Sequence, residues 1–378
     1  MKFSVSFNEL SSVMNVSSII LSDKIVEDKM KNVIFLIRKE GVRVCFYNAL
    51  TFSRTELSSA NVEDVEDEWM FQVKAAELSK ILSGFSTLSK TAVEDIVFEE
   101  NRNKIRVVVA EKAIKEEDSR MNQVSIFSLD NVPIIDSVGK EVKIVSPEDV
   151  DMIPSGDVLL YLDSLFPLMS NDSANSMGSK IHFVDDYVFV MSSFMNVFFK
   201  NRLPESFKNM ALGYSSVNFL KKLCELGDLS VSKDDKYLYV SVGSTEAFMR
   251  HQRVKIKYSQ YVERFTKDNG LVLNRLYFKD VLRRMGNVSP DGKCTVLENG
   301  DLDVGNTSFN QVIPVDKKKG EVSGISFKIS IPVLEKIIIG RDNIFPEELF
   351  MYLVKAGSGY SLFFSDKTGS WFSQTQVR

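Results

Sequence analysis

The sequence predicts an α+β protein in which one structural motif occurs six times. Each repeat reads strand, helix, hairpin and closing strand, a βαβββ order. Three patterns support this prediction: apolar residues that alternate as on a strand face, apolar residues at helical spacing, and β-rich runs around a turn signal. Because the chain has 378 residues, six repeats taken in pairs predict three domains near the common domain size.

Each repeat opens with two apolar residues in alternation, which suits a half-buried strand. The opening pairs are Phe3 and Val5, Phe71 and Val73, Val158 and Leu160, Leu212 and Tyr214, Leu271 and Leu273, and Phe327 and Ile329. A helix with one apolar face is predicted next. Its first apolar residue is Leu10, Leu78, Leu165, Phe219, Phe278 or Leu334.

A hairpin and a closing strand complete each repeat. The turn signals include Lys39-Glu40-Gly41, Asp185-Asp186 and Asn299-Gly300, of which Asn-Gly is a strong predictor of a tight hairpin. The closing strands are expected at Leu50–Leu57, Gln123–Leu129, Phe194–Leu203, Ala247–Ile256, Ser308–Val315 and Ser370–Val377.

Linkers divide the repeats into three domains, which we place at residues 1–132, 154–257 and 268–378. The acidic segment Asp130–Gly156 contains three prolines and reads as the first linker. Tyr258–Gly270 reads as the second linker, and Lys317–Gly320 as a basic loop inside the third domain.

Composition narrows the possible functions. The net charge of −4 means that a nucleic-acid role needs cations segregated onto one face. Cys45, Cys224 and Cys294 are odd in number and far apart, so we expect buried, reduced thiols and a cytoplasmic protein. No apolar run approaches the length of a membrane span, and we expect neither a signal peptide nor a membrane partner.

The sequence offers little catalytic chemistry. Only two histidines are present, and His182 lies in a predicted strand, where a structural role is expected. Asp185-Asp186 and Asp234-Asp235 occupy predicted hairpin tips, where Asp favours the turn itself. We therefore expect no catalytic site, no metal and no cofactor, and an enzyme is the least favoured hypothesis.

Cations recur on the helix faces that lie opposite the apolar stripe. Lys80, Lys221 and Lys336 share one register of three helices, and the fifth helix carries Lys279, Arg283 and Arg284. Lysines make loose, sequence-independent contacts with phosphates. A nucleic-acid backbone is therefore the predicted ligand of these residues, together with Lys222 and the nearby Lys24 and Lys90. The alternative is an ordinary solvated helix face, which carries lysines in any soluble protein.

Three stretches carry a resemblance to a known family. Met1–Val5 followed by Leu10, Gln123–Leu129 running into Pro133, and Ser259–Phe265 resemble the bacterial and bacteriophage sliding clamps, the processivity factors of replicative DNA polymerases. The resemblance implies a DNA clamp fold with helices lining a ring and antiparallel sheets outside. It also implies a head-to-tail homodimer around DNA, with a polymerase and a clamp loader as partners.

The resemblance further implies an apolar pocket for partner peptides between the second and third domains. The matching positions are Phe194, Met195, Val197, Tyr261, Phe265, Phe372 and Val377. The chain departs from the family at two stretches. Phe194–Val197 stands where the family has Gly-His-Arg-Leu, and Gln374–Arg378 stands where it has Met-Pro-Met-Arg-Leu. These departures favour a divergent viral clamp that binds a different partner motif. The alternative is a ring-forming structural or scaffold protein, such as a virion component, that holds no DNA.

Overall fold

In the computed structural model, the chain folds into two compact units. The first comprises residues 1–155 and 218–251, and the second comprises residues 156–217 and 252–378. The structure describes all residues except 23–30, 64, 66–67, 86–90, 114–122, 135–143, 171–177, 193–194, 255–257, 263–269, 289–292, 306–309, 316, 320–324, 329–333, 336–346, 357–358, 367–370 and 378.

Five helices of eleven or more residues are described, and each follows an opening strand or turn as the repeats predict. They are α1 (Phe7–Ser17), α2 (Ala75–Phe85), α4 (Ser155–Leu165), α5 (Tyr214–Leu226) and α7 (Arg275–Val288). Shorter helical segments are α6 (Ser259–Val262) and the 3₁₀ turns η1 (Ser18–Ser22), η4 (Phe166–Leu168) and η5 (Glu205–Phe207).

The first compact unit contains two antiparallel sheets. One has the order β5 (Asn61–Glu63), β1 (Lys2–Ser6), β7 (Thr91–Asn101), β8 (Lys104–Ala113) and β9 (Gln123–Asp130). The other has the order β10 (Asp151–Ile153), β15 (Leu229–Lys233), β16 (Tyr237–Val242), β17 (Thr245–Arg250), β4 (Thr51–Leu57), β3 (Gly41–Asn48), β2 (Asn32–Arg38) and β6 (Trp69–Lys74).

The second compact unit also contains two antiparallel sheets. The larger has the order β14 (Met210–Gly213), β11 (Lys180–Phe183), β12 (Tyr187–Met191), β13 (Met195–Lys200), β26 (Trp371–Val377), β25 (Gly359–Ser365), β24 (Glu348–Ala356), β18 (Gly270–Asn274) and β22 (Lys317–Lys319). The smaller has the order β21 (Asn310–Ile313), β20 (Leu302–Gly305), β19 (Lys293–Val296) and β23 (Ser326–Lys328).

Neighbouring repeats exchange their opening strands. Repeat one's β1 pairs with repeat two's β7, and repeat two's β6 pairs with repeat one's β2. The same exchange joins β10 to β15 and β14 to β11, and then β18 to β24 and β23 to β19. A single repeat therefore cannot complete a sheet, which explains why the repeats come in pairs.

Two further pairings join closing strands from different repeat pairs. We name the antiparallel pairing of β17 with β4 the first joint, and the pairing of β13 with β26 the second joint. Each joint converts two small sheets into one continuous sheet. The first joint lies wholly within the first compact unit, and the second lies wholly within the second unit.

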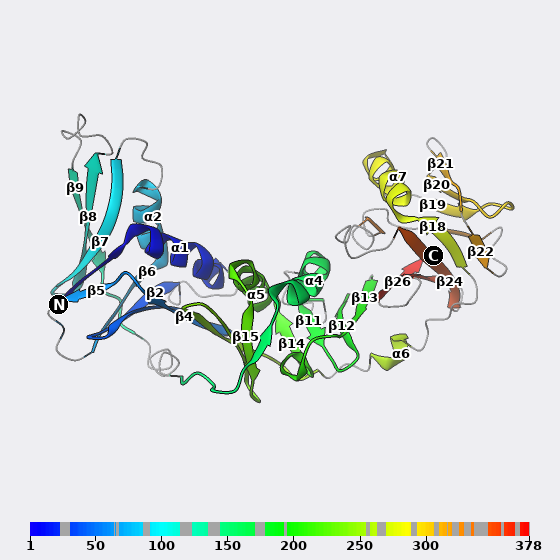
Figure 1. Cartoon of the computed structure of the whole chain (residues 1–378). Helices are drawn as coiled ribbons and strands as arrows, with labels where there is room; N and C mark the ends of the chain where they lie inside the picture. The colour runs from blue at the N-terminus through cyan, green and yellow to red at the C-terminus, as the bar shows by residue number, and fades with distance from the viewer. Residues whose placement is uncertain are drawn as a thin grey trace. The chain divides into compact units, whose positions relative to one another are not determined.

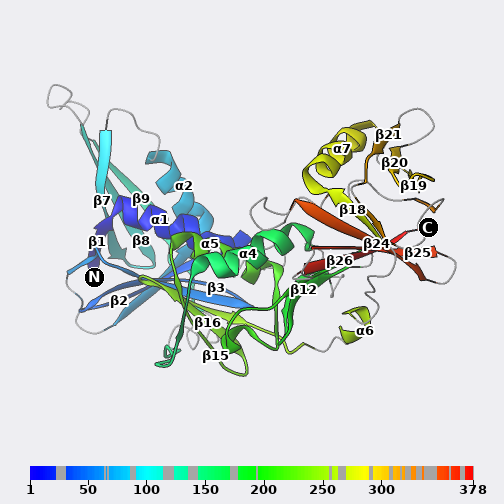
Figure 2. The ribbon, with the colours of Figure 1, turned by 45° about the vertical axis from the view of Figure 1, so that its right-hand side comes forward.

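Aromatic side chains fill the space between the two sheets of the first unit. The ring centroids of Phe3 and Phe98 lie 4.9 Å apart, and those of Phe35 and Phe71 lie 4.9 Å apart. All four side chains are fully buried. Because these residues come from β1, β2, β6 and β7, the strand exchange itself builds this core. Helices α1 and α2 lie side by side (Figure 1, Figure 2).

The structure corrects the sequence prediction in the third repeat. Val158 and Leu160, expected in a strand, lie in α4, and the opening strand is the three-residue β10 inside the predicted linker. The buried residues of α4, Val158, Tyr161, Leu162 and Leu165, follow helical spacing. Pro154 separates the strand from the helix.

Two smaller expectations also differ from the structure. Lys317–Lys319, expected in a loop, forms β22 through pairing with β18. The linker after Tyr258 contains the one-turn helix α6. Only Leu334 and Glu335 of the predicted sixth helix are described.

A buried ion pair fastens the first joint. Arg54 on β4 is 7 % exposed and donates from Nε to Oε2 of Glu246, the residue opposite it on β17. Arg54 also donates to the carbonyl oxygen of Ile144, at 2.6 Å, and to Oγ of Ser146, at 2.7 Å. Burial raises the pKa of Glu246, but the hydrogen bonds from Arg54 and Ser146 outweigh it and hold that pKa below its usual value.

We expect Glu246→Gln to lower the free energy of unfolding of the first unit by about 1–3 kcal/mol at pH 7, because Arg54 loses a charged acceptor. The folded pKa of Glu246 is depressed, so its contribution is present above pH 4.5 and is lost as the pH falls below it. The variant should therefore show a flatter loss of stability in acid. Thermal melts between pH 3 and pH 7 measure both effects.

Glu56→Gln is the matched control, because Glu56 forms an exposed pair with Arg43 at 3.4 Å in the same sheet. That variant should change stability by no more than about 0.5 kcal/mol. Equal losses in the two variants would show that the buried pair does not fasten the joint.

Candidate nucleic-acid and partner interfaces

The described cations of the helices gather on α5 and α7. Lys80 on α2 is exposed, Lys221 and Lys222 on α5 are half-buried, and Arg283 and Arg284 on α7 are exposed. Helices α1 and α4 carry no cation. The positive charge of the described helices is thus concentrated on the fourth and fifth repeats.

Local carboxylates partly neutralise these cations. Lys222 pairs with Glu225 one turn away at 2.6 Å, and Arg283 pairs with Glu335 at 3.8 Å. Lys279 is only 9 % exposed, so it lies on the buried side of α7. Lys24, Lys90 and Lys336, also predicted to contact DNA, lie outside the described residues.

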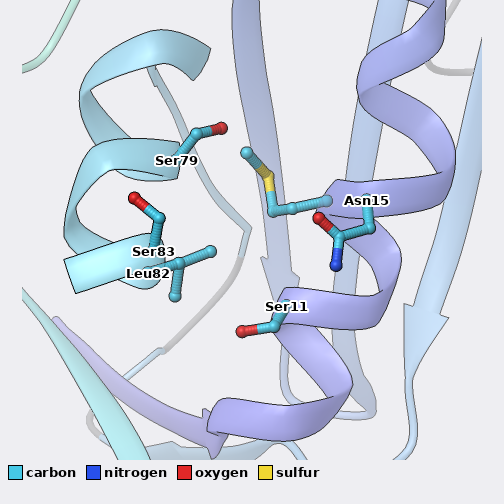
Figure 3. Close-up of a pocket in the computed structure, with 6 residues that line it drawn as sticks. Ser11, Asn15, Ser79, Leu82 and Ser83 are labelled. Atoms are coloured by element: carbon cyan, nitrogen blue, oxygen red, sulfur yellow. The ribbon is translucent and has the colours of Figure 1, made fainter. Parts of the chain in front are cut away.

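A small groove separates α1 from α2 (Figure 3). Its volume is about 120 Å³, and it is lined by Ser11, Met14, Asn15, Ser79, Leu82 and Ser83. The polar lining residues offer hydroxyl and amide groups without charge. Small-molecule sites usually measure about 300–1,000 Å³, so this groove is too small for a typical substrate.

A second hollow of about 420 Å³ lies on the β2–β3 hairpin. Its two arginines are already neutralised, because Arg38 pairs with Glu68 at 2.7 Å and Arg43 pairs with Glu56 at 3.4 Å. This hollow therefore offers no uncompensated charge to an anion.

An aromatic cluster covers one face of the second joint. We name it the second-joint cluster: Val184, Phe189, Met191, Phe198, Tyr352 and Phe363, flanked by the half-buried Tyr187, Val254, Tyr258, Val262, Phe350 and Val354. The rings of Phe189 and Phe198 lie 4.9 Å apart, and Tyr258 of the linker lies 5.7 Å from Phe189. Linker residues and strands thus form one apolar surface.

Two of the predicted pocket residues, Met195 and Val197, lie on the face of β13 opposite to this cluster. Met195 and Val197 alternate with Phe198 on β13, so they share the face of Phe199, which packs against Tyr161 of α4. Tyr261 lies in α6, and Phe372 and Val377 lie in β26. Phe194 and Phe265 lie outside the described residues.

Two closing strands remain at sheet borders, and both expose apolar side chains. On β9, Val124 is 64 % exposed and Ile126 is 55 % exposed; on β21, Val312 is 45 % exposed. Phe127 of β9 faces Phe85 of α2, and Gln311 of β21 donates to the hydroxyl of Tyr277 on α7. Alternation therefore puts the exposed apolar residues of both strands on the side away from the helix.

No family model matches the chain, and no curated protein matches it. Solved structures do. The DNA polymerase III beta chain of Streptococcus pneumoniae is 12% identical with a TM-score of 0.76, and the DNA polymerase sliding clamp of Bacillus subtilis is 11% identical with a TM-score of 0.75. Both matches cover 100% of this chain and 99% of theirs. The chain has the fold of these sliding clamps.

A third clamp structure agrees with the other two. The DNA polymerase III beta subunit of Thermotoga maritima is 13% identical, with a TM-score of 0.72, and the match covers 100% of this chain and 99% of that one. The predicted clamp fold is therefore confirmed along the whole chain. The site residues stay predictions, because a fold likeness at this identity does not assign them.

The polar residues singled out in the sequence have structural explanations. His182 is buried and stacks on Phe189 with ring centroids 4.9 Å apart. Oδ1 of Asp234 accepts hydrogen bonds from the backbone N–H groups of Lys236 and Tyr237, which closes the predicted hairpin tip. Among the described residues, no cluster of three His, Cys, Asp or Glu is placed to hold a metal.

No helix in the described part of the chain is long and apolar enough to cross a membrane.

The three cysteines are buried and form no disulfide, which confirms the sequence prediction. Burial raises the pKa of Cys45 and of Cys294 to about 12. We expect none of the three thiols to react with iodoacetamide in the folded protein at pH 8, and all three to react in guanidinium, because thiolates are the reactive form. Mass spectrometry of the labelled protein measures this, and rapid labelling of the folded chain would contradict the buried assignment.

Proposed function

We propose that this protein is a sliding clamp that encircles duplex DNA and tethers a replicative DNA polymerase. The observation that supports this most strongly is the full-length likeness to solved sliding clamps. The exposed cations of α2 and α7 and the half-buried lysines of α5 add to it, because they suit loose contact with a phosphate backbone. We divide the chain into domains at 1–132, 154–257 and 268–378, in line with the exchange of opening strands within each pair of repeats.

We propose that the ring closes by the kind of strand pairing seen at both joints. Each joint pairs a closing strand with a closing strand, and β9 and β21 are the remaining closing strands. Three apolar side chains are exposed on these border strands: Val124, Ile126 and Val312. Exposed apolar residues on an unpaired strand are typical of a surface that another strand covers. We infer that β9 of one subunit pairs with β21 of a second, and that a head-to-tail homodimer makes this contact twice.

Ile126→Glu and Val312→Glu should each yield monomers, because either change puts a charge into every copy of the interface. An equimolar mixture of the two variants should restore a dimer, since β9 of one and β21 of the other are intact. Analytical ultracentrifugation at micromolar concentration measures the masses. Dimers in the Val312→Glu variant alone would contradict a head-to-tail contact and indicate that β9 pairs with itself.

Met152→Glu is the matched control. Met152 is 68 % exposed on the border strand β10, which the proposed ring does not use. This variant should form dimers as the unchanged protein does. Its dissociation would show that any new surface charge breaks the assembly.

Topological capture tests the DNA role without knowledge of the loader. Gln123→Cys on β9 and Asn310→Cys on β21 place one new thiol on each of the two strands proposed to pair. A bismaleimide should link these thiols and close the ring, and the native thiols should not compete for it because they are buried. Rings closed in the presence of circular plasmid should stay bound in 1 M salt and leave once the plasmid is cut, because only topology survives such screening. Gel filtration separates the two states.

Charge reversal completes the capture test. Adding Lys221→Glu, Arg283→Glu and Arg284→Glu should leave ring closure intact but lower the captured plasmid by about tenfold, because each subunit loses phosphate contacts. Lys39→Glu, on the exposed tip of the β2–β3 hairpin, is the control and should capture normally. Rings that close fully but never hold plasmid would favour the scaffold alternative.

A polymerase and a clamp loader are the proposed protein partners, and the second-joint cluster is their proposed docking surface. The half-buried aromatic residues there can accept apolar side chains of an extended peptide. This role places the protein in the cytoplasm of a bacterial cell, and its departures from the family stretches favour a bacteriophage origin.

A further inference from the structure

The described parts of the first linker lie at three places along the eight-stranded sheet of the first unit. At one border, the backbone N–H of Val132 donates to the carbonyl oxygen of Gln72 on β6 at 2.9 Å. In the middle, Ile144 packs against the buried cluster that contains Phe52 and Phe248. At the opposite border, the linker itself becomes the strand β10. The linker therefore covers one border of the sheet and forms the other.

The strand register shows which way Met152 of β10 points. Met152 stands opposite Ser230 of β15, and Ser230 stands opposite Ser241 of β16. Ser241 in turn stands opposite Glu246, the acid of the buried ion pair. Residues that stand opposite one another in a sheet point to the same face. Met152 therefore lies on the face against which Ile144 packs, at the border end of this row.

The outer border of β10 has no partner strand in the part of the chain that the structure describes, since its pairing is with β15 alone. Two other border strands are bridged by neighbouring chain. Val132 bonds to β6, and Gln252 exchanges two backbone hydrogen bonds with Ala211 of β14, at 2.8 and 3.1 Å. A border without such a bridge offers its backbone donors and acceptors to a further strand.

Apolar side chains gather beside this border. Met152 is 68 % exposed and Val150 is 38 % exposed. Val145 is 86 % exposed, and it lies between Ile144 and Ser146, which both contact the sheet. A border strand that is only protected from pairing carries charges or proline in place of apolar residues. The exposed apolar residues here are instead a feature of contact surfaces.

Carboxylates surround these apolar side chains. Glu148, Asp149 and Asp151 are all exposed, and no Lys, Arg or His occurs between residues 144 and 155. Alternation along β10 puts Asp151 and Met152 on opposite faces. A strand that pairs with β10 would therefore meet a carboxylate on one face and an apolar side chain on the other. Charge complementarity favours a partner in which basic and apolar residues alternate.

We propose that β10 binds an extended, basic segment of a partner protein, which adds to the sheet as a further strand. The backbone of this segment pairs with β10, its apolar side chains cover Met152 and Val150, and its lysines or arginines lie beside Asp151. The proposed ring uses β9 and β21, and the proposed docking of the polymerase and the loader uses the second joint. The contact at β10 is therefore additional to the proposed function.

Two labelled probes test the proposal by fluorescence anisotropy. One is fluorescein-Gly-Lys-Val-Lys-Val-Lys-Val-Lys-amide. The other is fluorescein-Gly-Lys-Lys-Val-Val-Val-Lys-Lys-amide, which has the same composition and charge without the alternation. The unchanged protein should bind the alternating probe about tenfold more tightly, because only that probe puts all its valines on one face of a paired strand.

Two variants locate the binding. Asp151→Lys should weaken binding of the alternating probe by about tenfold, because a lysine on β10 repels a basic strand. Met152→Ser should weaken it by about threefold through the lost apolar contact. Glu40→Lys is the matched control, since it reverses an exposed carboxylate at the β2–β3 turn of the same unit. It should bind as the unchanged protein does, and thermal melts confirm that all three variants are folded.

Each contrary outcome overturns the proposal. Absence of binding at about 1 mM alternating probe would remove the site, and equal affinities of the two probes would indicate charge attraction without strand pairing. Equal losses in Asp151→Lys and Glu40→Lys would place the binding elsewhere. Oligomers larger than a dimer that vanish in Asp151→Lys would show that a second copy of this chain occupies β10 in place of a partner protein. The plasmid-capture result depends on none of these and tests the ring by itself.

Discussion

The antiparallel pairing of closing strands is the constraint on which the rest of the structure depends. A strand at a sheet border leaves a row of backbone donors and acceptors without partners. In this chain the backbone groups at the border of β4 pair with those of β17, and the backbone groups of β13 pair with those of β26. Because the paired strands lie far apart in the sequence, these ladders join different pairs of repeats into continuous sheets. The exposed apolar residues of β9 and β21 then have a common explanation, since both strands are closing strands that the chain itself leaves at a border.

The two joints show how one architecture acquires different chemistry. Their backbone registers correspond residue by residue, and both carry an aromatic cluster on one face. The first joint adds a buried ion pair, which needs several hydrogen bonds to offset the desolvation of two charges. Two residues outside the sheet supply some of those hydrogen bonds. The carbonyl oxygen of Ile144 accepts from Arg54, and Oγ of Ser146 donates to Glu246, so this segment helps to stabilise the two charges. The second joint carries a neutral amide pair, Asn196 opposite Gln374, at the corresponding place.

Much of the fold was predictable from the sequence, because strong alternation and helical spacing mark most repeats. The opening strands of repeats one, two and five lie where their apolar pairs stand. In repeat four, Leu212 lies in β14 as predicted, but Tyr214, also expected in the strand, is the first residue of α5. The prediction of the opening strand in the third repeat was wrong for a physical reason. The strand β10 has three residues, and only Ile153 is buried, so its sequence shows no apolar alternation. The prediction of a loop at β22 was wrong for another reason. Three consecutive lysines have a low strand propensity, and they form a strand here because β18 pairs with them.

The candidate sites were less predictable than the fold, because they depend on which face a strand presents. Met195 and Val197 lie on the closing strand β13, as the sequence predicts, but a step of one residue along a strand moves a side chain to the opposite face. Phe198, between Val197 and Phe199, is the residue that reaches the second-joint cluster. Gln374 carries no sequence signal at all, since a lone glutamine in a terminal strand is ordinary. Its register with Asn196, compared with that of Arg54 with Glu246, shows that the two joints carry different side-chain pairs at equivalent places.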